Sequence, residues 1–335
     1  MTSECGLGRG SPVYLEEVKI HGFKSYATEI VINFKPGIGV IIGSNGVGKS
    51  NILDAIAWAL GESDLHRLRC HSDTDLFFSG TREYPPAETA AVTLALKLGL
   101  EKKAPGMQMT RQRDRLGRER FLLDEEEIAQ VDYQQRIKET GLLNAKKTLI
   151  RQEEINNFLA LDPEDRLKYL ADLFHPRPVN DDLVAKLNNG FKQMLKMLIP
   201  DSDGHLLLAA TGRGPGLIVE MAFPGKGMRN SILLSGGEKT ICSLALHLAF
   251  FEELPSPFYM FDEVEPSLDW TNHHHMQKLF KRLAENRQLI MITHLRSTIE
   301  LADTLHGIRA RNDGTSFAKF YFRMDERILR AYKCC

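Results

Sequence analysis

The sequence predicts an α/β fold built on a parallel or mixed sheet, and three stretches support that prediction. An apolar run over residues 39–43 leads through a glycine-rich loop into a helical pattern over residues 51–60. A second apolar run, residues 258–261, ends in two carboxylates, as is typical of buried parallel strands with functional residues at one edge. Helical and strand patterns alternate through the last third of the chain, which favours helices packed on a sheet.

The composition limits the class of protein. The chain has 335 residues, of which 43% are hydrophobic, enough for one large domain or two lobes. Its net charge is −1, so a nucleic-acid role requires a local basic patch. No apolar run reaches the roughly 18 residues of a membrane span, and residues 1–12 read as a flexible tail rather than a signal peptide. The cysteines lack metal-ligand spacing and indicate a reducing, intracellular environment; they are Cys5, Cys70, Cys242, Cys334 and Cys335.

Strand patterns dominate the first half of the chain. Alternation of apolar and polar residues predicts strands over 13–20, 27–34 and 89–98. Residues 109–123 predict a β-hairpin whose turn lies at 114–117. The polar segment 125–140 is expected to form a helix.

A helix start is clear at residue 162. Asp162 suits the N-cap, Pro163 the first helical position and Glu164 the positive end of the helix dipole, which predicts a helix to about Phe174. The second half is expected to contain a helix over 183–198, strands over 206–210 and 217–223, and a helix over 240–251.

Two prolines interrupt the chain within residues 175–182. Because proline stops a helix, we expect a lobe boundary there. The predicted organisation is an N-terminal lobe over 13–175, a short junction over 176–182 and a C-terminal lobe over 183–335.

The glycine-rich loop fits the pattern G-x-x-x-x-G-K-[ST] of phosphate-binding loops. Its glycines let backbone N–H groups surround phosphate oxygens at a helix N-terminus. We expect Lys49 to reach the β- and γ-phosphates of a nucleoside triphosphate and Ser50 to bind Mg²⁺. The residues of this loop and the one that follows are Gly43, Ser44, Asn45, Gly46, Val47, Gly48, Lys49, Ser50 and Asn51.

The carboxylates after the second apolar run suit the chemistry of that loop. Asp262 is expected in the Mg²⁺ shell, and Glu263 is expected to polarise the attacking water. A strand ending in Asp-Glu is common, so the assignment depends on its pairing with the phosphate loop.

A second anion-binding helix start precedes the helix over 240–251, formed by Ser235, Gly236, Gly237 and Glu238. Alone it fits equally well a simple helix-entry turn. Its place, one helix before the carboxylate strand, resembles the signature motif of the ABC-type ATPases, where such a loop caps the γ-phosphate held by a second subunit.

The ABC resemblance assigns further residues. Gln152 matches the Q-loop glutamine, a ligand of Mg²⁺ and water; Asp269 matches the D-loop; and His294 matches the switch histidine. The resemblance implies an ATPase head with a mixed or parallel sheet core, an antiparallel β subdomain and a helical lobe bearing the signature motif. It also implies ATP and Mg²⁺ as cofactors, and two nucleotides held between this chain and a second copy or a homologous head.

Several stretches resemble the SMC (structural maintenance of chromosomes) family in particular; they are residues 18–26, 50–62, 68–80 and 262–269. The likeness covers about 13–175 and 183–323 and implies a DNA-associated role in chromosome organisation, segregation or repair, in the cytoplasm and nucleoid or the nucleus. Arg69 takes the position of an arginine-finger-like residue; the alternative is a surface salt-bridge arginine. About eight residues, 175–182, replace the family's long coiled coil and hinge, which fits either a naturally armless relative or removed arms.

A basic patch on the predicted hairpin is the candidate DNA contact, formed by Arg111, Arg113, Arg118 and Arg120. Arg113, Arg118 and Arg120 are expected to share a face. The alternative is a solvated basic hairpin. Two other functions stay open: an ABC ATPase coupled to a protein or membrane partner without DNA, and a nucleotide-gated interaction module.

Overall fold

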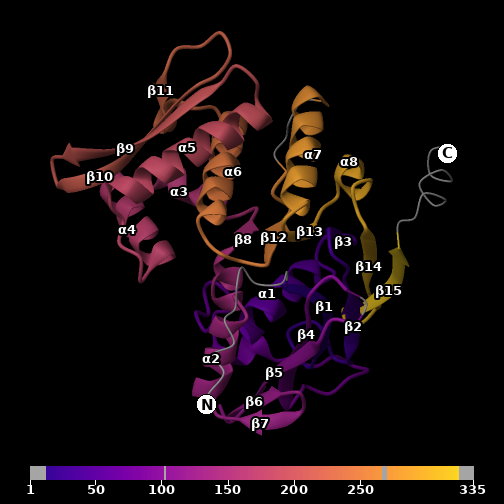
Figure 1. The fold of residues 1–335 in the computed structure, drawn as a ribbon. Coiled ribbons are helices and arrows are strands. Elements are labelled where there is room, and N and C mark those ends of the chain that lie inside the picture. The colour runs from indigo at the N-terminus through magenta and orange to yellow at the C-terminus, as the bar shows by residue number, and fades with distance from the viewer. Residues whose placement is uncertain (1–12, 102, 266–269, 324–335) are drawn as a thin grey trace, which may run out of the picture.

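The computed structural model describes residues 13–101, 103–265 and 270–323 (Figure 1). The predicted tail over 1–12 and Asp269 lie outside the described residues. The central sheet consists of β3 (Ile38–Ile42), β8 (Leu149–Arg151), β12 (Phe258–Asp262), β13 (Gln288–Ile292), β14 (Thr304–Ala310) and β15 (Ser316–Arg323). The strands are ordered β15-β14-β3-β13-β12-β8, and only the β14–β15 pair is antiparallel.

Both faces of this central sheet are covered. Along β12, Phe258 and Met260 pack into one hydrophobic cluster, whereas Tyr259 and Phe261 pack into another. Side chains alternate across a strand, so an uninterrupted apolar run is what a strand with two buried faces requires. The carboxyl end of this apolar strand carries the carboxylates of Asp262 and Glu263.

An antiparallel sheet packs on one side of the core (Figure 1). Its order is β2-β1-β4-β5-β6-β7. The strands are β1 (Val13–His21), β2 (Ile30–Asn33), β4 (Thr89–Leu98), β5 (Gly106–Asp114), β6 (Glu119–Leu123) and β7 (Glu126–Ile128). Helix α1 (Lys49–Ala59) contacts β1, β4 and β5 of this sheet and β12 of the central sheet. It is buried on nearly every side because it lies between two layers.

A helical lobe covers the other side (Figure 1). Its helices are α3 (Asn157–Ala160), α4 (Pro163–Phe174), α5 (Asp181–Leu198), α6 (Gly236–Glu252) and, beside them, α7 (Trp270–Ala284). A three-stranded sheet of β9 (Asp203–Thr211), β10 (Gly214–Ala222) and β11 (Arg229–Asn230) packs on α4 and α5. The mixed core, the antiparallel subdomain and the helical lobe confirm the predicted fold class.

Most local predictions hold, although the strand expected over 27–34 is shorter, since β2 spans Ile30–Asn33. The strand over 89–98, the hairpin and the helix from Pro163 to Phe174 lie where the patterns put them. The helix expected over 125–140 is shorter: α2 spans Gln130–Glu139. Asp124 and Glu125 adopt left-handed backbone angles, φ 48° and 72°, and turn the chain so that residues 126–128 pair with β6 as β7 instead.

The junction between α4 and α5 is short, because α4 ends at Phe174 and α5 begins at Asp181. Phe174 and Leu183, on either side of it, belong to the same hydrophobic cluster. The helix before the prolines therefore packs with the helical lobe, and the division at 175–182 stays a prediction.

Candidate nucleotide-binding site

The phosphate loop joins β3 to α1, as its sequence context predicts. Gly48, the N-cap of α1, has a left-handed backbone, with φ 91°. A Cβ added there would lie 2.4 Å from Ser25 Oγ and 2.5 Å from Ser316 Oγ. The Tyr26 hydroxyl donates a 2.9 Å hydrogen bond to the Gly48 carbonyl. Glycine is therefore required at this position by both the backbone angle and the packing.

Lys49 folds back over the loop from the first turn of α1. Its Nζ donates hydrogen bonds to the carbonyls of Gly43, at 2.9 Å, and Ser44, at 3.0 Å. The same nitrogen lies 3.4 Å from Glu263 Oε1 and 3.1 Å from His294 Nε2. The ammonium group is thus held at the meeting point of the loop and two strand ends.

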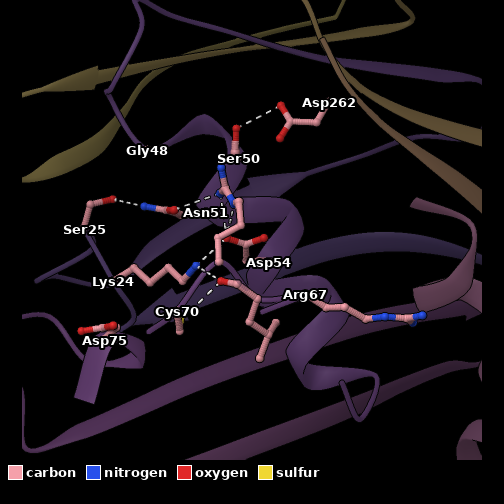
Figure 2. A network of polar contacts seen from close by, with 12 residues as sticks. Lys24, Ser25, Gly48, Ser50, Asn51, Asp54, Arg67, Cys70, Asp75 and Asp262 are labelled. Carbon is pink, nitrogen blue, oxygen red and sulfur yellow. Dashed lines mark hydrogen bonds and ion pairs between the residues drawn. The ribbon is translucent and has the colours of Figure 1, made fainter. Parts of the chain in front are cut away.

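Ser50 and Asp262 form the oxygen pair that Mg²⁺ prefers. The Ser50 hydroxyl donates a 3.0 Å hydrogen bond to Asp262 Oδ1 (Figure 2). Burial raises the pKa of Asp262, and the Ser50 hydrogen bond and then the charges of Arg69 and Arg151 oppose that rise. The backbone N–H of Gln152 donates to the Asp262 carbonyl at 2.9 Å, which brings the Q-loop beside the same strand end.

Mg²⁺ fits this donor set. The described residues contain no group of three or more His, Cys, Asp or Glu side chains able to enclose a metal ion. Mg²⁺ commonly takes only one or two carboxylates from the protein and completes its shell with water and phosphate oxygens. A serine hydroxyl beside one buried aspartate matches this coordination preference.

Glu263 follows Asp262 at the end of β12 in a left-handed conformation, φ 52°. Its N–H donates to the Ile292 carbonyl at 2.9 Å, and its Oε1 lies 2.7 Å from His294 Nε2. A non-glycine residue at positive φ is unfavourable by about 1–3 kcal/mol and is typical of functional sites. The turn directs the Glu263 carboxylate toward Lys49 and His294.

The cleft formed by these segments has a volume of about 290 Å³. It is lined by Asn45, Gly46, Gly48, Lys49, Ser50, Asn51, Arg69, Arg151, Gln152, Glu153, Asp262 and Glu263. Ser235 to Glu238 do not line it, although they lie within the described part of the chain.

Arg69 lines the cleft from the turn that follows α1. Its Nη2 lies 2.7 Å from Asp54 Oδ2 and 3.3 Å from Asn51 Oδ1. Asn51 Nδ2 in turn donates to Ser25 Oγ at 2.8 Å (Figure 2). Burial lowers the pKa of Arg69, but the carboxylates of Asp54, Asp262 and Glu153 together outweigh burial and raise it overall.

Two residues of this network escaped the sequence analysis. Asp54 is fully buried on α1, and Arg151, the last residue of β8, is 4% exposed and lines the cleft. Each had a weak sequence signal: Asp54 lies one helical turn after Ser50, and Arg151 directly precedes Gln152. Neither position belongs to a motif that spacing alone identifies.

The signature segment starts α6 on the helical lobe. Glu238 Oε2 accepts hydrogen bonds from Ser235 N at 2.9 Å and from Ser235 Oγ at 2.8 Å. A hydrogen bond from Lys226, followed by those from Ser235, lowers the pKa of Glu238 to about 2. A Cβ added to Gly236 or Gly237 would meet no atom within 4 Å. The helix start is thus capped and open to solvent.

Most of the chain matches one protein-family model. The model of the RecF/RecN/SMC N-terminal domain matches residues 14–317. The chain belongs to this family. Two chromosome partition proteins Smc are among its relatives: that of Mycobacterium tuberculosis is 37% identical over 172 residues, and that of Mycoplasma pneumoniae is 33% identical over 165.

Each of these alignments covers 48% of the chain, but only 14% and 17% of the respective Smc protein. The chain therefore spans a small part of its curated relatives. Solved SMC heads are covered almost completely. An Smc head bound to the C-winged helix domain of ScpA matches with TM-score 0.80 and 26% identity, over 94% of the chain and 99% of that head. The SMC head domain from Thermotoga maritima matches with TM-score 0.66 and 28% identity, over 93% and 99%.

The hairpin corrects part of the predicted basic patch. Arg111 is 5% exposed; its guanidinium packs on the Trp58 ring and lies 2.9 Å from Glu119. It is a core residue and cannot contact DNA phosphates. Arg113 pairs across the strands with Glu119, whereas Arg120 pairs with Gln112.

Adjacent positions of a strand face opposite sides, so Arg113 and Arg120 do not share a face, contrary to the prediction. Arg118 and Arg120 are exposed, and each forms an ion pair, with Asp114 at 2.6 Å and Glu127 at 2.7 Å. Only these two of the four arginines present a mainly exposed guanidinium group.

Within the described residues, no helix combines the length and apolar character needed to cross a membrane.

Proposed function

We propose that this chain binds ATP·Mg²⁺ and hydrolyses ATP as one of two heads that close on two nucleotides, and that this cycle drives a DNA-associated process in chromosome organisation, segregation or repair. One observation carries the proposal. Lys49, Ser50, Asp262 and Glu263 gather on one cleft, while the Ser235 helix start remains outside it and open to solvent.

Nucleotide binding falls to the phosphate loop. The loop amides and Lys49 hold the β- and γ-phosphates, and Asn51 adds an amide side chain beside them. Ser50 and Asp262 hold Mg²⁺, with Gln152 beside them as a further ligand to the metal or to a bound water. When bound, the metal neutralises charge that develops on the phosphate oxygens.

Hydrolysis depends on Glu263. Phosphoryl transfer needs mostly positioning and charge stabilisation, so the carboxylate orients a water and accepts its proton. His294 lies within hydrogen-bonding distance of Glu263 and fixes its direction, and Lys49 stabilises charge on the phosphate. Arg69, which also lines the cleft, supplies a second cation.

The partner is a second copy or a homologous head. The backbone N–H groups of its exposed Gly236 and Gly237 close over the γ-phosphate, and its Ser235 hydroxyl exchanges the Glu238 carboxylate for a phosphate oxygen. The N–H of Ser235 is already engaged by Glu238, so the serine is held in one orientation before the heads meet. The predicted role of Asp269 at this interface stays part of the proposal.

DNA and a ScpA-like protein are the proposed further partners. Exposed Arg118 and Arg120 supply the remaining basic groups of the hairpin, and the similarity to an Smc head bound to ScpA motivates the protein partner. A chromosome-associated location follows from the same proposal. The test is ATP turnover with and without duplex DNA at 50 and 200 mM salt: stimulation that falls steeply with salt supports the DNA-associated role. Turnover that DNA does not change at either salt concentration contradicts it.

A further inference from the structure

A buried carboxylate lies directly beneath the phosphate cleft. Asp54 is on α1, one turn after Ser50, and its side chain is fully buried (Figure 2). A buried carboxylate without charged partners is strongly unfavourable, so the role of Asp54 depends on the cations that surround it.

Three cations surround Asp54. Lys24 Nζ lies 2.5 Å from Oδ2, Arg69 Nη2 lies 2.7 Å from the same oxygen, and Arg151 Nη2 lies 2.7 Å from Oδ1. They come from the loop after β1, the turn after α1 and the end of β8. One carboxylate therefore connects three segments that are distant in sequence.

Two of these cations have an unfavourable backbone. Lys24 has φ 51° and Arg69 has φ 54°, both in the left-handed region that non-glycine residues rarely adopt. Such conformations persist only where surrounding contacts hold them. Lys24 also donates a hydrogen bond to the carbonyl of Leu68, the residue before Arg69, so Lys24 connects the two strained turns directly.

The two arginines reach the cleft from Asp54. Arg69 and Arg151 both line it, and Arg151 Nη1 lies 4.0 Å from Asp262 Oδ2. Arg151 is next to Gln152, whose N–H holds the Asp262 carbonyl. A change at Asp54 thus reaches the phosphates through Arg69 and the metal side through Arg151.

We propose that Asp54 is a positioning residue: it holds the guanidinium groups of Arg69 and Arg151 at the two sides of the cleft where the phosphates and Asp262 need them. The proposal rests on nucleotide binding at the cleft. It predicts that loss of the Asp54 charge weakens ATP binding, whereas simple electrostatics predicts tighter binding. Removing a negative charge near phosphates strengthens anion binding, whereas releasing two positioned arginines weakens it.

The test measures the dissociation constant of ATP·Mg²⁺ in a Glu263→Gln background, where turnover does not interfere. Asp54→Asn keeps the shape and removes the charge; we expect about tenfold weaker binding, the size of one well-placed charged contact. In an Arg69→Ala background the same substitution is expected to change binding less than threefold, because its main route to the phosphates is already gone. This non-additivity would not arise from a general loss of stability.

Glu119→Gln is the matched control, since Glu119 also pairs with a buried arginine but lies on the hairpin, away from the cleft. It is expected to leave ATP binding unchanged. Unchanged or tighter binding by Asp54→Asn, or full additivity with Arg69→Ala, overturns the proposal. Should Asp54→Asn not fold, Arg69→Ala alone decides, because unaltered ATP affinity in that variant excludes positioning through Arg69. Absence of ATP binding by the Glu263→Gln parent instead contradicts the proposed function.

Discussion

The Ser50 hydroxyl donates a 3.0 Å hydrogen bond to the Asp262 carboxylate across 212 positions of sequence. Ser50 lies in the first turn of α1, and Asp262 ends strand β12. The core sheet brings the two together because β3 and β12 both pair with β13 in parallel, so their carboxyl ends meet at one edge.

Asp262→Asn tests the metal role of this pair. An amide oxygen is a weaker Mg²⁺ ligand than a carboxylate. We therefore expect the factor by which Mg²⁺ strengthens ATP binding to fall at least tenfold. The measurement is the ratio of ATP dissociation constants in Mg²⁺ and in EDTA. Glu253→Gln, which changes a carboxylate paired with Arg177 away from the cleft, should leave the ratio unaltered. An unchanged ratio for Asp262→Asn would rule out this metal site.

Ser235→Arg separates dimer closure from nucleotide binding. The new side chain fills the space that a partner's γ-phosphate needs, whereas the cleft of the same molecule is untouched. We expect ATP binding to remain and ATP-driven dimerisation to be lost, with about 1 kcal/mol of stability lost from the helix cap. Sedimentation with ATP measures the loss of dimerisation. Ser235→Thr keeps the hydroxyl and should still dimerise.

Arg111→Ala and Arg120→Ala distinguish a core arginine from a surface one. Loss of Arg111 removes the stacking on Trp58 and leaves Glu119 without this partner, so we expect about 3 kcal/mol of destabilisation in denaturant unfolding. Arg120 pairs with Glu127 in solvent, and its loss should leave the midpoint of denaturant unfolding nearly unchanged. Equal effects would contradict the burial of Arg111.

His306 predicts a pH-dependent stability. Burial lowers its pKa to about 4 from the ordinary 6.5, and its ring stacks on Tyr321 with centroids 4.9 Å apart. Below about pH 6.5 the unfolded chain takes up a proton that the folded chain does not bind until about pH 4. The free energy of unfolding therefore falls across that window, by about 3 kcal/mol.

His306→Phe removes this titration and keeps an aromatic ring beside Tyr321. Denaturant unfolding of the two proteins at pH 7 and at pH 5 gives the comparison. The loss of stability on acidification should be smaller in the variant. The same loss in both proteins would mean that His306 does not titrate in this way.

Local chemistry allowed much of the fold to be predicted. The helix at Pro163 was placed correctly because a proline at the first helical position and acidic residues in the first turn are local signals, although Asp162 makes no side-chain capping hydrogen bond. The strand over 89–98 was placed correctly because its alternation continues along its whole length. The strand over 126–128 was missed because its acidic residues resemble an exposed helix, and only pairing with β6 makes it a strand.

The site was predictable where motifs contain its residues and not where distant charges meet. Lys49, Ser50 and Asp262 belong to recognisable patterns. Asp54 contacts Lys24, Arg69 and Arg151, and no periodicity relates those four positions. The burial of Arg111 was also missed, because it depends on Trp58 of α1 packing beneath the hairpin. Both misses are tertiary contacts between elements whose order along the chain does not indicate their proximity.

The central claim is that two heads close on ATP, and the mass of Glu263→Gln measures it most directly. In light scattering with Mg²⁺ and saturating ATP, we expect about twice the monomer mass, and a monomer without nucleotide. Addition of Ser235→Arg to the same chain should return it to a monomer in ATP. A Glu263→Gln protein that binds ATP yet stays a monomer would contradict the two-head mechanism for this chain.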